Sequence, residues 1–430
     1  MLDIHYFCLL KTLFMQVFKF GGASVKDAQG VRNVERVLLQ CGAENTIVVV
    51  SAMGKTTNNL EKIVQYHLEG NPLWKEVLED VRRIHYAVME ELFPRKEHTV
   101  YQEVEHVLTQ IRLICQAPPE HDYNMHYDRI VSYGEIISTR IVSAFLNDSG
   151  WNNQWLDARK LIKTDANHRF ARINWSFTEV LVQQAIRPNN NYVIQGFIGS
   201  DDNLHATTLG REGSDYTASV LAYVLNAGEV CIWKDVPGVL NGDPKVFSDV
   251  KLINHISYRE AIELAYFGAS VIHPKTIQPL QRKDIPLYVK SFLEPGNPGT
   301  RISNGPDLSP ELPIFIRKTD QAILKISTRD LAFIVEENLS AIYNIFHRYG
   351  TRVNLMQNSA VSSRFCINND PISTPKVVAE LQKDFDVEFE TDITLFTIRH
   401  DKGNSRETLG SIGEVRMEQR TPNVMQFAAK

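Results

Sequence analysis

The chain has 430 residues, of which 43% are hydrophobic, and its formal net charge is −5. A chain of this length and apolar content can build two or more domains with complete cores. The acidic balance and the lack of a long basic block argue against a nucleic-acid partner. No apolar run is long enough to cross a membrane, and five scattered cysteines without a CxxC pair favour reduced thiols in a cytoplasmic protein.

Residues 1–14 are expected to be a non-native extension. They are rich in apolar residues, but Asp3, His5 and Lys11 interrupt the run, and no small-residue cleavage site follows it. A secretory signal peptide is therefore a poor interpretation. Met15 directly precedes the first predicted strand, so we interpret it as the native start.

Residues 15–293 are predicted to form an α/β domain, a three-layer αβα sandwich. Apolar runs rich in Val, Ile and Phe alternate with helical segments, at 16–20, 46–51, 192–198, 229–236 and 286–291. Continuous runs of this kind are typical of parallel strands buried on both faces, with ligands at the carboxyl ends of the strands. A charged, amphipathic stretch over 58–127 predicts a helical insertion beside the first two strands.

The rest of the chain is predicted to hold a linker and a smaller α+β region. Prolines and glycines concentrate at 294–313, which favours a linker. Over 314–430 the order strand, helix, strand, strand, helix, strand predicts a ferredoxin-like module. Two further strands are expected within 413–429. The chain between the preceding strand, which ends near residue 400, and these two strands is too short for a full helix. We therefore interpret them as a truncated second module.

The first candidate site is the segment 17–24, which reads VFKFGGAS. A strand that ends in glycines before a helix offers free N–H groups and a helix dipole to an anion. Lys19, just before Gly21 and Gly22, can add a full positive charge where a phosphoryl group would sit. An ordinary strand followed by a turn is the plainer alternative.

The second candidate site is the segment 207–217, which reads TTLGREGSDYT and precedes an apolar helix. Ser214 or Asp215 could simply cap that helix. Capping alone does not call for two threonines, two glycines and an arginine. Together these residues offer hydroxyl and N–H donors, a guanidinium that can grip a carboxylate with two hydrogen bonds, and an acid near a metal–phosphate.

Two common nucleotide-binding motifs are excluded. Gly54-Lys55-Thr56 resembles the end of a Walker A loop, but Val49 stands where the first glycine of that loop is required. No GxGxxG sequence follows a predicted strand, so a dinucleotide-binding site is also unsupported.

Seven motifs in chain order resemble the aspartate kinases, which belong to the amino-acid kinase superfamily and carry C-terminal ACT domains. The similarity covers nearly everything from Met15 onward. The motifs are Lys19-Phe20-Gly21-Gly22, Ser51-Ala52-Met53-Gly54, Ser132-Tyr133-Gly134-Glu135, Gln195-Gly196-Phe197-Ile198-Gly199, the loop 208–216, Trp233-Lys234-Asp235-Val236-Pro237-Gly238 and Phe267-Gly268-Ala269-Ser270-Val271-Ile272-His273-Pro274.

The resemblance implies ATP-dependent phosphorylation of the β-carboxylate of L-aspartate to 4-phospho-L-aspartate. This reaction is the first step toward lysine (through diaminopimelate), threonine and methionine. The implied cofactors are ATP and Mg²⁺, with the metal held mainly by the ATP phosphates. The resemblance also implies a cytoplasmic homodimer that pairs through the ACT region.

The resemblance also implies roles for individual residues. The implied catalytic residues are Lys19 and Asp215. The implied aspartate-binding residues are Ser51, Thr57, Glu135, Arg211, Gly213 and Ser214, with Arg211 on the α-carboxylate and Glu135 on the ammonium group. The implied ATP- and phosphate-binding residues are Lys19, Gly21, Gly22, Ser24, Lys234, Asp235, Asn241, Lys245 and Ser270.

Several positions depart from the usual family pattern. Lys234, Leu240, Lys245 and Ser270 replace threonine, tyrosine, arginine and lysine, and Glu212 interrupts what is usually a Gly-Gly pair. These changes alter the side chains expected to contact the nucleotide, and Lys234 can restore the charge lost at Ser270.

The predicted regulatory site departs from the pattern as well. In lysine-sensitive relatives, acids hold the ammonium groups of lysine at the positions that Asn354 and Ala360 occupy here. We therefore expect weak or absent inhibition by lysine, with the ACT region retained chiefly for dimerisation.

Two other functions remain open at this stage. The first is another amino-acid kinase, acting on glutamate or acetylglutamate. The second is an amino-acid sensor that has lost catalysis, although retention of Lys19, Glu135, Arg211 and Asp215 argues against it. Taken singly, Glu135 would be expected as a surface acid on a helix, and His273 before Pro274 as a structural cap.

Overall fold

The computed structural model describes residues 14–120, 122–269, 272–330, 332–401, 403, 409 and 412–430. All but Phe14 of the predicted extension, residues 1–14, lies outside this part of the chain. The chain divides into two compact units. The first comprises Met1–Val239, Asn254–Ile262 and Val271–Asp307, and the second comprises Leu240–Ile253, Glu263–Ser270 and Leu308–Lys430.

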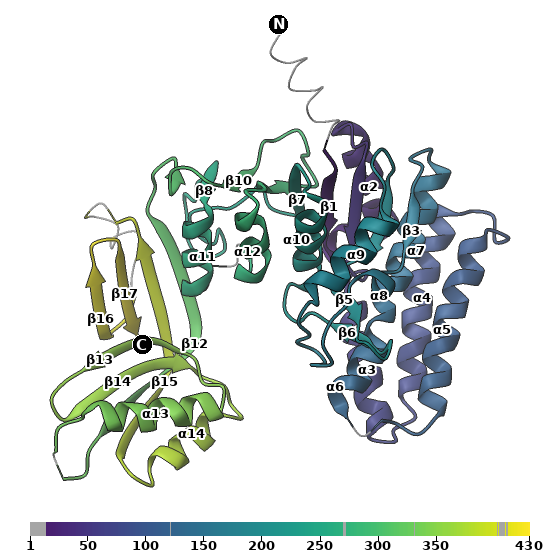
Figure 1. Cartoon of the computed structure of the whole chain (residues 1–430). Helices are drawn as coiled ribbons and strands as arrows, with labels where there is room; N and C mark the ends of the chain where they lie inside the picture. Colours follow the sequence, from purple (N-terminus) through teal and green to yellow (C-terminus); the bar gives the residue numbers. More distant parts are fainter. Residues whose placement is uncertain are drawn as a thin grey trace, which may run out of the picture. The chain divides into compact units, whose positions relative to one another are not determined.

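A mostly parallel sheet forms the centre of the first unit (Figure 1). The strands of this sheet that belong to the first unit lie in the order β8 (His255–Ser257), β10 (Thr300–Ser303), β9 (Leu287–Ser291), β7 (Glu229–Lys234), β1 (Gln16–Phe20), β2 (Thr46–Val50), β4 (Tyr192–Gln195) and β3 (Gln154–Leu156). Among these described strands, β9 and β10 pair antiparallel, and the other neighbouring pairs are parallel. Every residue of β2, with the sequence TIVVV, is buried, as expected of a strand that is covered on both faces.

Helices cover this sheet and confirm the predicted α/β architecture. Helix α7 packs on β2, β3 and β4, and α10 packs on β1, β2 and β7. The helices described in or entering this unit are α2 (Ala28–Gln40), α3 (Thr56–Leu68), α4 (Trp74–Leu92), α5 (Thr99–Gln116), α6 (Tyr123–Val131), α7 (Tyr133–Asp148), α8 (Ala158–Leu161), α9 (Trp175–Ala185), α10 (Gly213–Leu225), α11 (Tyr258–Phe267) and α12 (Pro274–Arg282). The amphipathic stretch at 58–127 forms the predicted helical insertion, in which α4 and α5 lie side by side (Figure 1).

One predicted strand is divided in the structure. The run at 192–198 was expected as a single strand, but β4 ends at Gln195 and a separate strand, β5 (Ile198–Ser200), begins three residues later. Strand β5 pairs with β6 (Ala206–Thr208) in its own two-stranded sheet. Phe197 has a φ of 70°, and this left-handed conformation turns the chain out of the main sheet.

The stretch at 294–313, expected as a linker, contains regular structure. Strand β10 lies inside it and pairs with both β8 and β9. The short strand β11 (Leu308–Ser309) follows. A dense run of prolines and glycines thus brackets a strand here, because turn residues border short strands as readily as they mark linkers.

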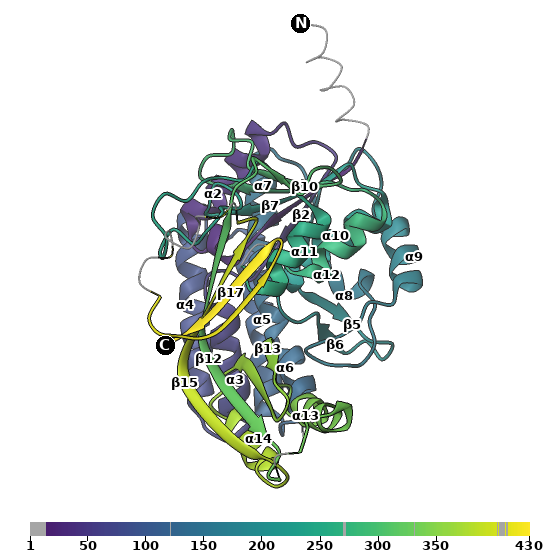
Figure 2. The ribbon, with the colours of Figure 1, turned by 90° about the vertical axis from the view of Figure 1, so that its left-hand side faces the viewer.

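The second unit is built on a six-stranded antiparallel sheet. Its order is β13 (Val353–Asn358), β14 (Ser362–Asn368), β12 (Ile314–Ser327), β15 (Asp386–Arg399), β17 (Val424–Ala429) and β16 (Val415–Thr421). The long strands β12 and β15 run side by side (Figure 2). Helices α13 (Glu336–Arg348) and α14 (Thr374–Leu381) pack on the sheet through a buried cluster that includes Leu324, Phe346 and Phe365. The predicted ferredoxin-like order is confirmed, and the two tail strands extend the same sheet.

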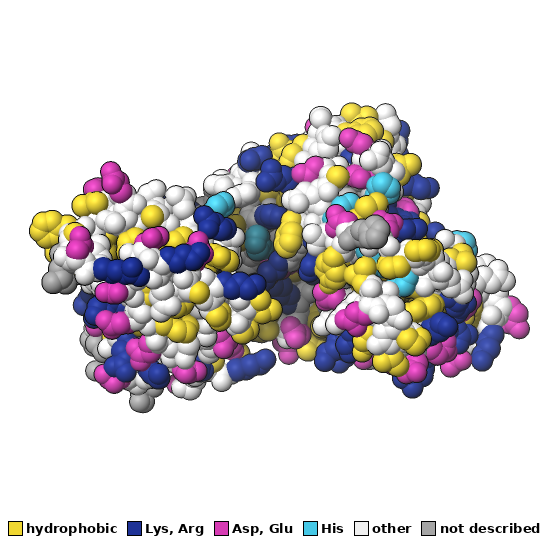
Figure 3. Space-filling view, turned by 90° about the horizontal axis from the view of Figure 1, so that it is seen from below, with side chains coloured by type: hydrophobic (Ala, Val, Ile, Leu, Met, Phe, Trp, Pro, Cys, Tyr) yellow, Lys and Arg dark blue, Asp and Glu magenta, His cyan; other side chains and the backbone are white. Residues whose placement is uncertain are grey.

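The surface carries both signs of charge. Figure 3 shows lysine and arginine side chains as well as aspartate and glutamate side chains on the face in view. Among the described residues, no helix combines the length and apolarity required to cross a bilayer.

Candidate active site

A cavity of about 350 Å³ lies in the first unit where three neighbouring strands end. Lys19 is on β1, Ser51 directly follows β2, and Lys234 is the last residue of β7. Carboxyl ends of parallel strands meet at one edge of a sheet, which is why residues far apart in sequence meet here. The described residues lining it are Lys19, Ser51, Thr57, Glu135, Phe197, Gly210, Glu212, Gly213, Ser214, Asp215 and Lys234.

An ion pair spans one side of this cavity. The Nζ atom of Lys19 lies 2.6 Å from Oδ1 of Asp215, and both side chains are largely buried. Asp215 is in the first turn of α10, which packs directly on β1. The pair therefore fixes the lysine ammonium at the end of the strand, facing the cavity.

Glu135 is buried in the first turn of α7 and is only partly hydrogen-bonded. Its Oε1 accepts a long hydrogen bond of 3.3 Å from the amide of Ala52. Its Oε2 is buried with no partner among the described residues. Burial raises the pKa of Glu135 to about 8, and the bond from Ala52 only partly offsets this effect. The expectation of a surface acid is wrong, because α7 turns this face toward the sheet.

Another part of the cavity lining is formed by close packing around Ser51 and Ser214. The hydroxyl of Ser51 lies 2.9 Å from that of Ser214 and donates to it. A Cβ on Gly196 would lie 2.4 Å from the Cβ of Ser214, and one on Gly213 would lie 2.6 Å from the ring of Phe197. Only glycine permits this approach, so both positions hold α10 against the end of β4.

The glycine pair after β1 differs in detail from the sequence prediction. It leads into a four-residue 3₁₀ turn, Gly22–Val25, and α2 begins only at Ala28 with Asp27 as its side-chain cap. The predicted helix N-terminus directly after the glycines is therefore wrong. A Cβ on Gly22 would lie 2.6 Å from the carbonyl oxygen of Ala52, which explains the glycine by close packing.

The two threonines of the second loop are used inside the protein. The Thr207 hydroxyl bonds to that of Thr164 at 2.7 Å, and the Thr208 hydroxyl donates to Asp128 Oδ1 at 2.6 Å. The expectation that they present hydroxyl donors to a ligand is wrong. Asp128, which no motif singled out, is the residue that sequence reasoning missed here.

Glu212 has an unusual role at the start of α10. It occupies the N-cap position in the left-handed region, with φ 54° and ψ 30°, and its side chain does not cap the helix. Instead its Oε2 accepts a 2.8 Å hydrogen bond from the amide of His273. Ser214 and Asp215 lie inside the helix, so the plainer alternative, in which either residue caps it, does not hold.

His273 caps α12, as expected. Its Nδ1 accepts from the amide of Lys275. Burial lowers the pKa of His273, and the charge of Glu212 opposes this effect. The imidazole is therefore engaged in helix structure, in line with the structural interpretation of the sequence.

The other predicted site residues are placed as follows. Arg211 is exposed and is not among the described residues that line the cavity. Ser24 is buried in the 3₁₀ turn, and Asp235 lines a neighbouring cavity of about 650 Å³ beside α2. Ser270 lies outside the described residues.

Two predicted nucleotide contacts belong to the second unit. The side chain of Asn241 donates to the carbonyl of Pro313 and accepts from the amide of Lys251. Lys245 is exposed. Both polar ends of Asn241 are thus occupied by backbone groups.

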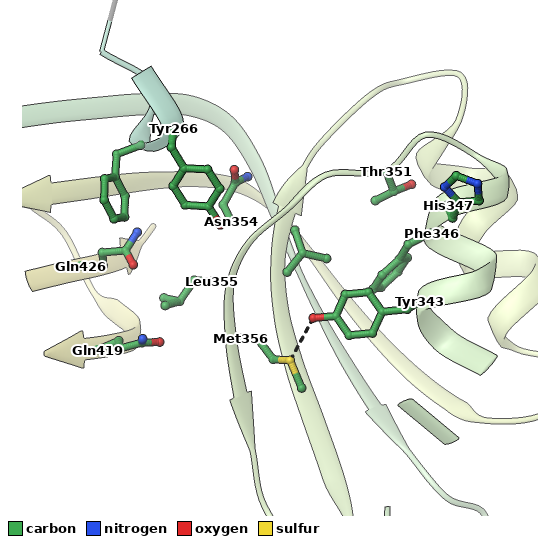
Figure 4. A pocket seen from close by; sticks show the side chains of 12 residues that line it. Tyr266, Tyr343, Phe346, His347, Thr351, Asn354, Leu355, Met356, Gln419 and Gln426 are labelled. Atoms are coloured by element: carbon green, nitrogen blue, oxygen red, sulfur yellow. Dashed lines mark hydrogen bonds between the residues drawn. The ribbon is translucent and has the colours of Figure 1, made fainter. Parts of the chain in front are cut away.

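A second cavity of about 630 Å³ lies wholly within the second unit (Figure 4). Tyr266, Tyr343 and Phe346 contribute aromatic rings, and the Tyr343 hydroxyl contacts the sulfur of Met356. None of the described residues that line it carries a carboxylate.

Sequence and structure comparisons agree on one family. Residues 15–291 match the amino acid kinase family. The lysine-sensitive aspartokinase 3 of Escherichia coli is 33% identical over 394 residues, covering 89% of this chain and 86% of that protein. The chloroplastic aspartokinase 1 of Arabidopsis thaliana is 34% identical over 360 residues, covering 80% of this chain and 62% of that protein.

A crystal structure of E. coli aspartokinase III in complex with aspartate and ADP superposes with a TM-score of 0.80. It is 30% identical in sequence, and the match covers 96% of both chains. The aspartate kinase of Clostridium acetobutylicum, at 22% identity and a TM-score of 0.77, shares the fold. This chain belongs to the amino acid kinase family and, within it, to the aspartokinases.

Proposed function

We propose that this aspartokinase transfers the γ-phosphoryl group of ATP to the β-carboxylate of L-aspartate in the cavity of the first unit. The observation that carries the proposal is the buried, unpartnered Oε2 of Glu135 beside the Lys19–Asp215 ion pair. A buried carboxylate without a partner is unfavourable. Its presence in the wall of a cavity points to a ligand that brings a cation.

The ammonium group of aspartate supplies that cation. Glu135 would bind it, with Ser51, Thr57, Gly213 and Ser214 lining the same space. The E. coli aspartokinase III that resembles this chain was crystallised with aspartate and ADP, which supports the same pair of ligands here. Arg211 would clamp the α-carboxylate with two hydrogen bonds, and because its side chain is exposed, that contact requires the guanidinium to turn inward.

The chemistry needs no general base. A carboxylate with a pKa near 4 in solution is already ionised at neutral pH and can attack the γ-phosphorus directly, with ADP leaving. The barrier arises because two anions must meet. Preorganised positive charge therefore supplies the catalysis, and Lys19, held by Asp215, is placed for that role.

Nucleotide binding is proposed at the same strand ends. Gly21 lies beside the ammonium group of Lys19, since a Cβ on Gly21 would lie 3.4 Å from Nζ, and Lys234 enters the cavity from β7. The amides of Gly21 and Gly22 would donate to a phosphate there. Ser24, Asp235, Asn241 and Lys245 stay weaker candidates, because none of them lines this cavity, and Ser270 lies outside the described residues.

Mg²⁺ is proposed to arrive with ATP. Among the described residues, no group of three His, Cys, Asp or Glu side chains could hold a metal ion. A site with one or two carboxylates still fits Mg²⁺, because this ion commonly keeps several waters and binds mainly through the phosphates of a nucleotide. Of the carboxylates that line the cavity, Asp215 lies beside Lys19 and would share the ion, and Mg²⁺ would neutralise charge on the phosphates.

We also propose a cytoplasmic homodimer that pairs through the ACT region. The support is the resemblance to ACT-containing kinases and the scattered cysteines, which suit a reducing compartment. Light scattering coupled to size exclusion measures the oligomeric state.

Formation of acyl hydroxamate from purified protein, ATP, Mg²⁺ and hydroxylamine tests the proposed reaction. L-Aspartate is expected to support product formation, whereas L-glutamate and N-acetyl-L-glutamate are not. The isosteric Glu135→Gln variant serves as the control, and its KM for aspartate should rise. Preference for glutamate would identify another amino-acid kinase, and no product from any acid by folded protein would favour a sensor.

A further inference from the structure

A buried carboxylate outside the cavity connects two segments that would hold aspartate, the start of α7 with Glu135 and the loop that follows β6. Asp128 lies on α6 and is fully buried. Its Oδ1 accepts from the Thr208 hydroxyl at 2.6 Å. Its Oδ2 accepts from the amides of Thr208 at 3.0 Å and Arg169 at 2.9 Å, and from Nδ1 of His168 at 3.0 Å. Four donors thus converge on one side chain.

Asp128 is joined on one side to the helix that carries Glu135. Its backbone carbonyl accepts from the amide of Ser132. Ser132 ends α6 and begins α7. Glu135, the proposed partner of the aspartate ammonium group, is in the first turn of α7. The same short stretch of helix therefore fixes the positions of both Asp128 and Glu135.

On the other side Asp128 holds the start of the glycine loop. Thr208 is the last residue of β6, and Gly210, Glu212 and Gly213 of the next five residues line the cavity. The loop that contains Arg169 also supports this segment, since a Cβ on Gly210 would lie 3.2 Å from the Arg169 carbonyl oxygen.

We propose that Asp128 is a positioning residue for aspartate binding, which sets the separation between Glu135 and the loop 210–214. The proposal rests on the function proposed above. Asp128 touches no substrate; it acts by holding two substrate-binding segments in one geometry. Small displacements of such segments weaken binding and turnover strongly.

Hydrogen-bond chemistry makes the carboxylate difficult to replace. An ionised carboxylate is an acceptor at both oxygens, whereas an asparagine has one acceptor oxygen and an NH₂ donor. In Asp128→Asn, that NH₂ group would face either the Thr208 hydroxyl or the three N–H donors. With the NH₂ group against the N–H donors, the contacts to Thr208 and Arg169 would be lost. With the NH₂ group against the Thr208 hydroxyl, that hydroxyl would accept a bond from a neutral amide in place of donating one to a charged carboxylate. Both orientations therefore weaken the link between the two segments.

A matched control is available in the same unit. Asp201 is also buried, and it accepts from the amides of Asn203 and His205 and from Nδ1 of His205. It organises the turn between β5 and β6, and it is not among the residues that line the cavity. Asp201→Asn therefore measures what losing a buried, loop-organising aspartate does to stability alone.

The test measures KM for aspartate, KM for ATP and kcat per folded enzyme, with the folded fraction determined by circular dichroism. Asp128→Asn is expected to raise KM for aspartate about tenfold or more, with a change of less than about twofold for ATP. Asp201→Asn should leave both values unchanged at comparable loss of thermal stability. If Asp128→Asn does not fold, Thr208→Val removes one donor and Thr208→Ser retains it, so only the valine variant should raise KM for aspartate.

The two proposals fail in different ways. Wild-type protein that forms no aspartyl hydroxamate would overturn the proposed function. The positioning role alone would be overturned if the wild-type protein is active and the Asp128→Asn or Thr208→Val variant keeps its kcat and its KM for aspartate.

Discussion

The ammonium group of Lys19 lies 2.6 Å from Oδ1 of Asp215, although one residue is on the first strand and the other opens a helix near the middle of the chain. Each side chain is the charged partner that lets the other be buried. The pair sets the lysine at the edge of the sheet where a phosphoryl group would approach. This contact connects the fold of the first unit to its proposed chemistry.

Lys19→Ala is predicted to lower kcat by roughly 10²–10³, the scale for one preorganised charge-stabilising donor. The variant leaves Asp215 buried without its partner, so it should also be less stable. The double variant Lys19→Ala, Asp215→Asn should recover stability but not turnover. Lys26→Ala, at an exposed lysine of the same segment, is the control, and near-normal turnover of Lys19→Ala would remove Lys19 from the mechanism.

Glu135 is predicted to make the ligand-free protein less stable as pH rises. Burial raises the pKa of Glu135 from its ordinary value of 4.5 to about 8, so the folded state holds this proton more tightly than the unfolded state does. The free energy of unfolding should therefore fall as pH rises from about 4.5 to about 8. Glu135→Gln has no titratable group at this position, so its free energy of unfolding lacks this pH dependence. The variant should be more stable than wild type at pH 8.5 but not at pH 5.

Urea denaturation at both pH values measures the effect. Added aspartate should stabilise the wild type more than Glu135→Gln, because it supplies the missing cation. Parallel stability profiles for the two proteins between pH 5 and 8.5 would contradict the assignment of an unpaired carboxylate at this position.

Glu212 is predicted to be held in its strained conformation by its bond to the amide of His273. A left-handed conformation costs a non-glycine residue about 1–2 kcal/mol, and the charge-assisted hydrogen bond offsets this. Glu212→Ala keeps the strain and loses the bond, whereas Glu212→Gly loses both. The glycine variant should therefore be more stable than the alanine variant by about 1 kcal/mol in urea denaturation, and the reverse order would show that φ at this position is not strained.

Inhibition by lysine is predicted to be weak or absent. Asn354 stands at the position expected for an effector-binding acid, and its amide bonds to Lys318, Gln321 and Asn368. No described residue lining the adjacent cavity (Figure 4) is Asp or Glu, and a buried ammonium without a carboxylate is unfavourable. Titration of lysine into the hydroxamate assay, with threonine in parallel, measures this, and inhibition at micromolar lysine would contradict it.

Much of the fold was predictable because its signals are local and strong. Continuous Val and Ile runs such as 46–50 have few alternatives to a buried parallel strand, and the amphipathic stretch over 58–127 contains long helices such as α5. The strand 192–198 was mispredicted because its division depends on a left-handed Phe197. That conformation follows from tertiary packing of α10, which a local pattern does not report.

The site was predictable in its residues more than in its contacts. The order of motifs indicated Lys19, Glu135 and Asp215, which the structure brings to one cavity. Sequence could not reveal that Glu135 is buried, since a single acid on a helix gives no sign of which face it occupies. It also could not reveal that Asp128 binds the Thr208 hydroxyl, because that contact joins a helix and a strand that lie far apart in the sequence and share no pattern.

The central claim is that Glu135 takes the ammonium group of aspartate in this cavity, and calorimetry tests it most directly. Titrating aspartate into the protein at pH 7, in two buffers of different ionisation enthalpy, counts the protons released on binding. Because Glu135 is mostly protonated in the empty site and must ionise to pair with the ammonium, we predict release of about one proton per aspartate. The Glu135→Gln variant should bind more weakly and release none. Aspartate binding without proton release in the wild type, at an affinity that Glu135→Gln matches, would contradict the account.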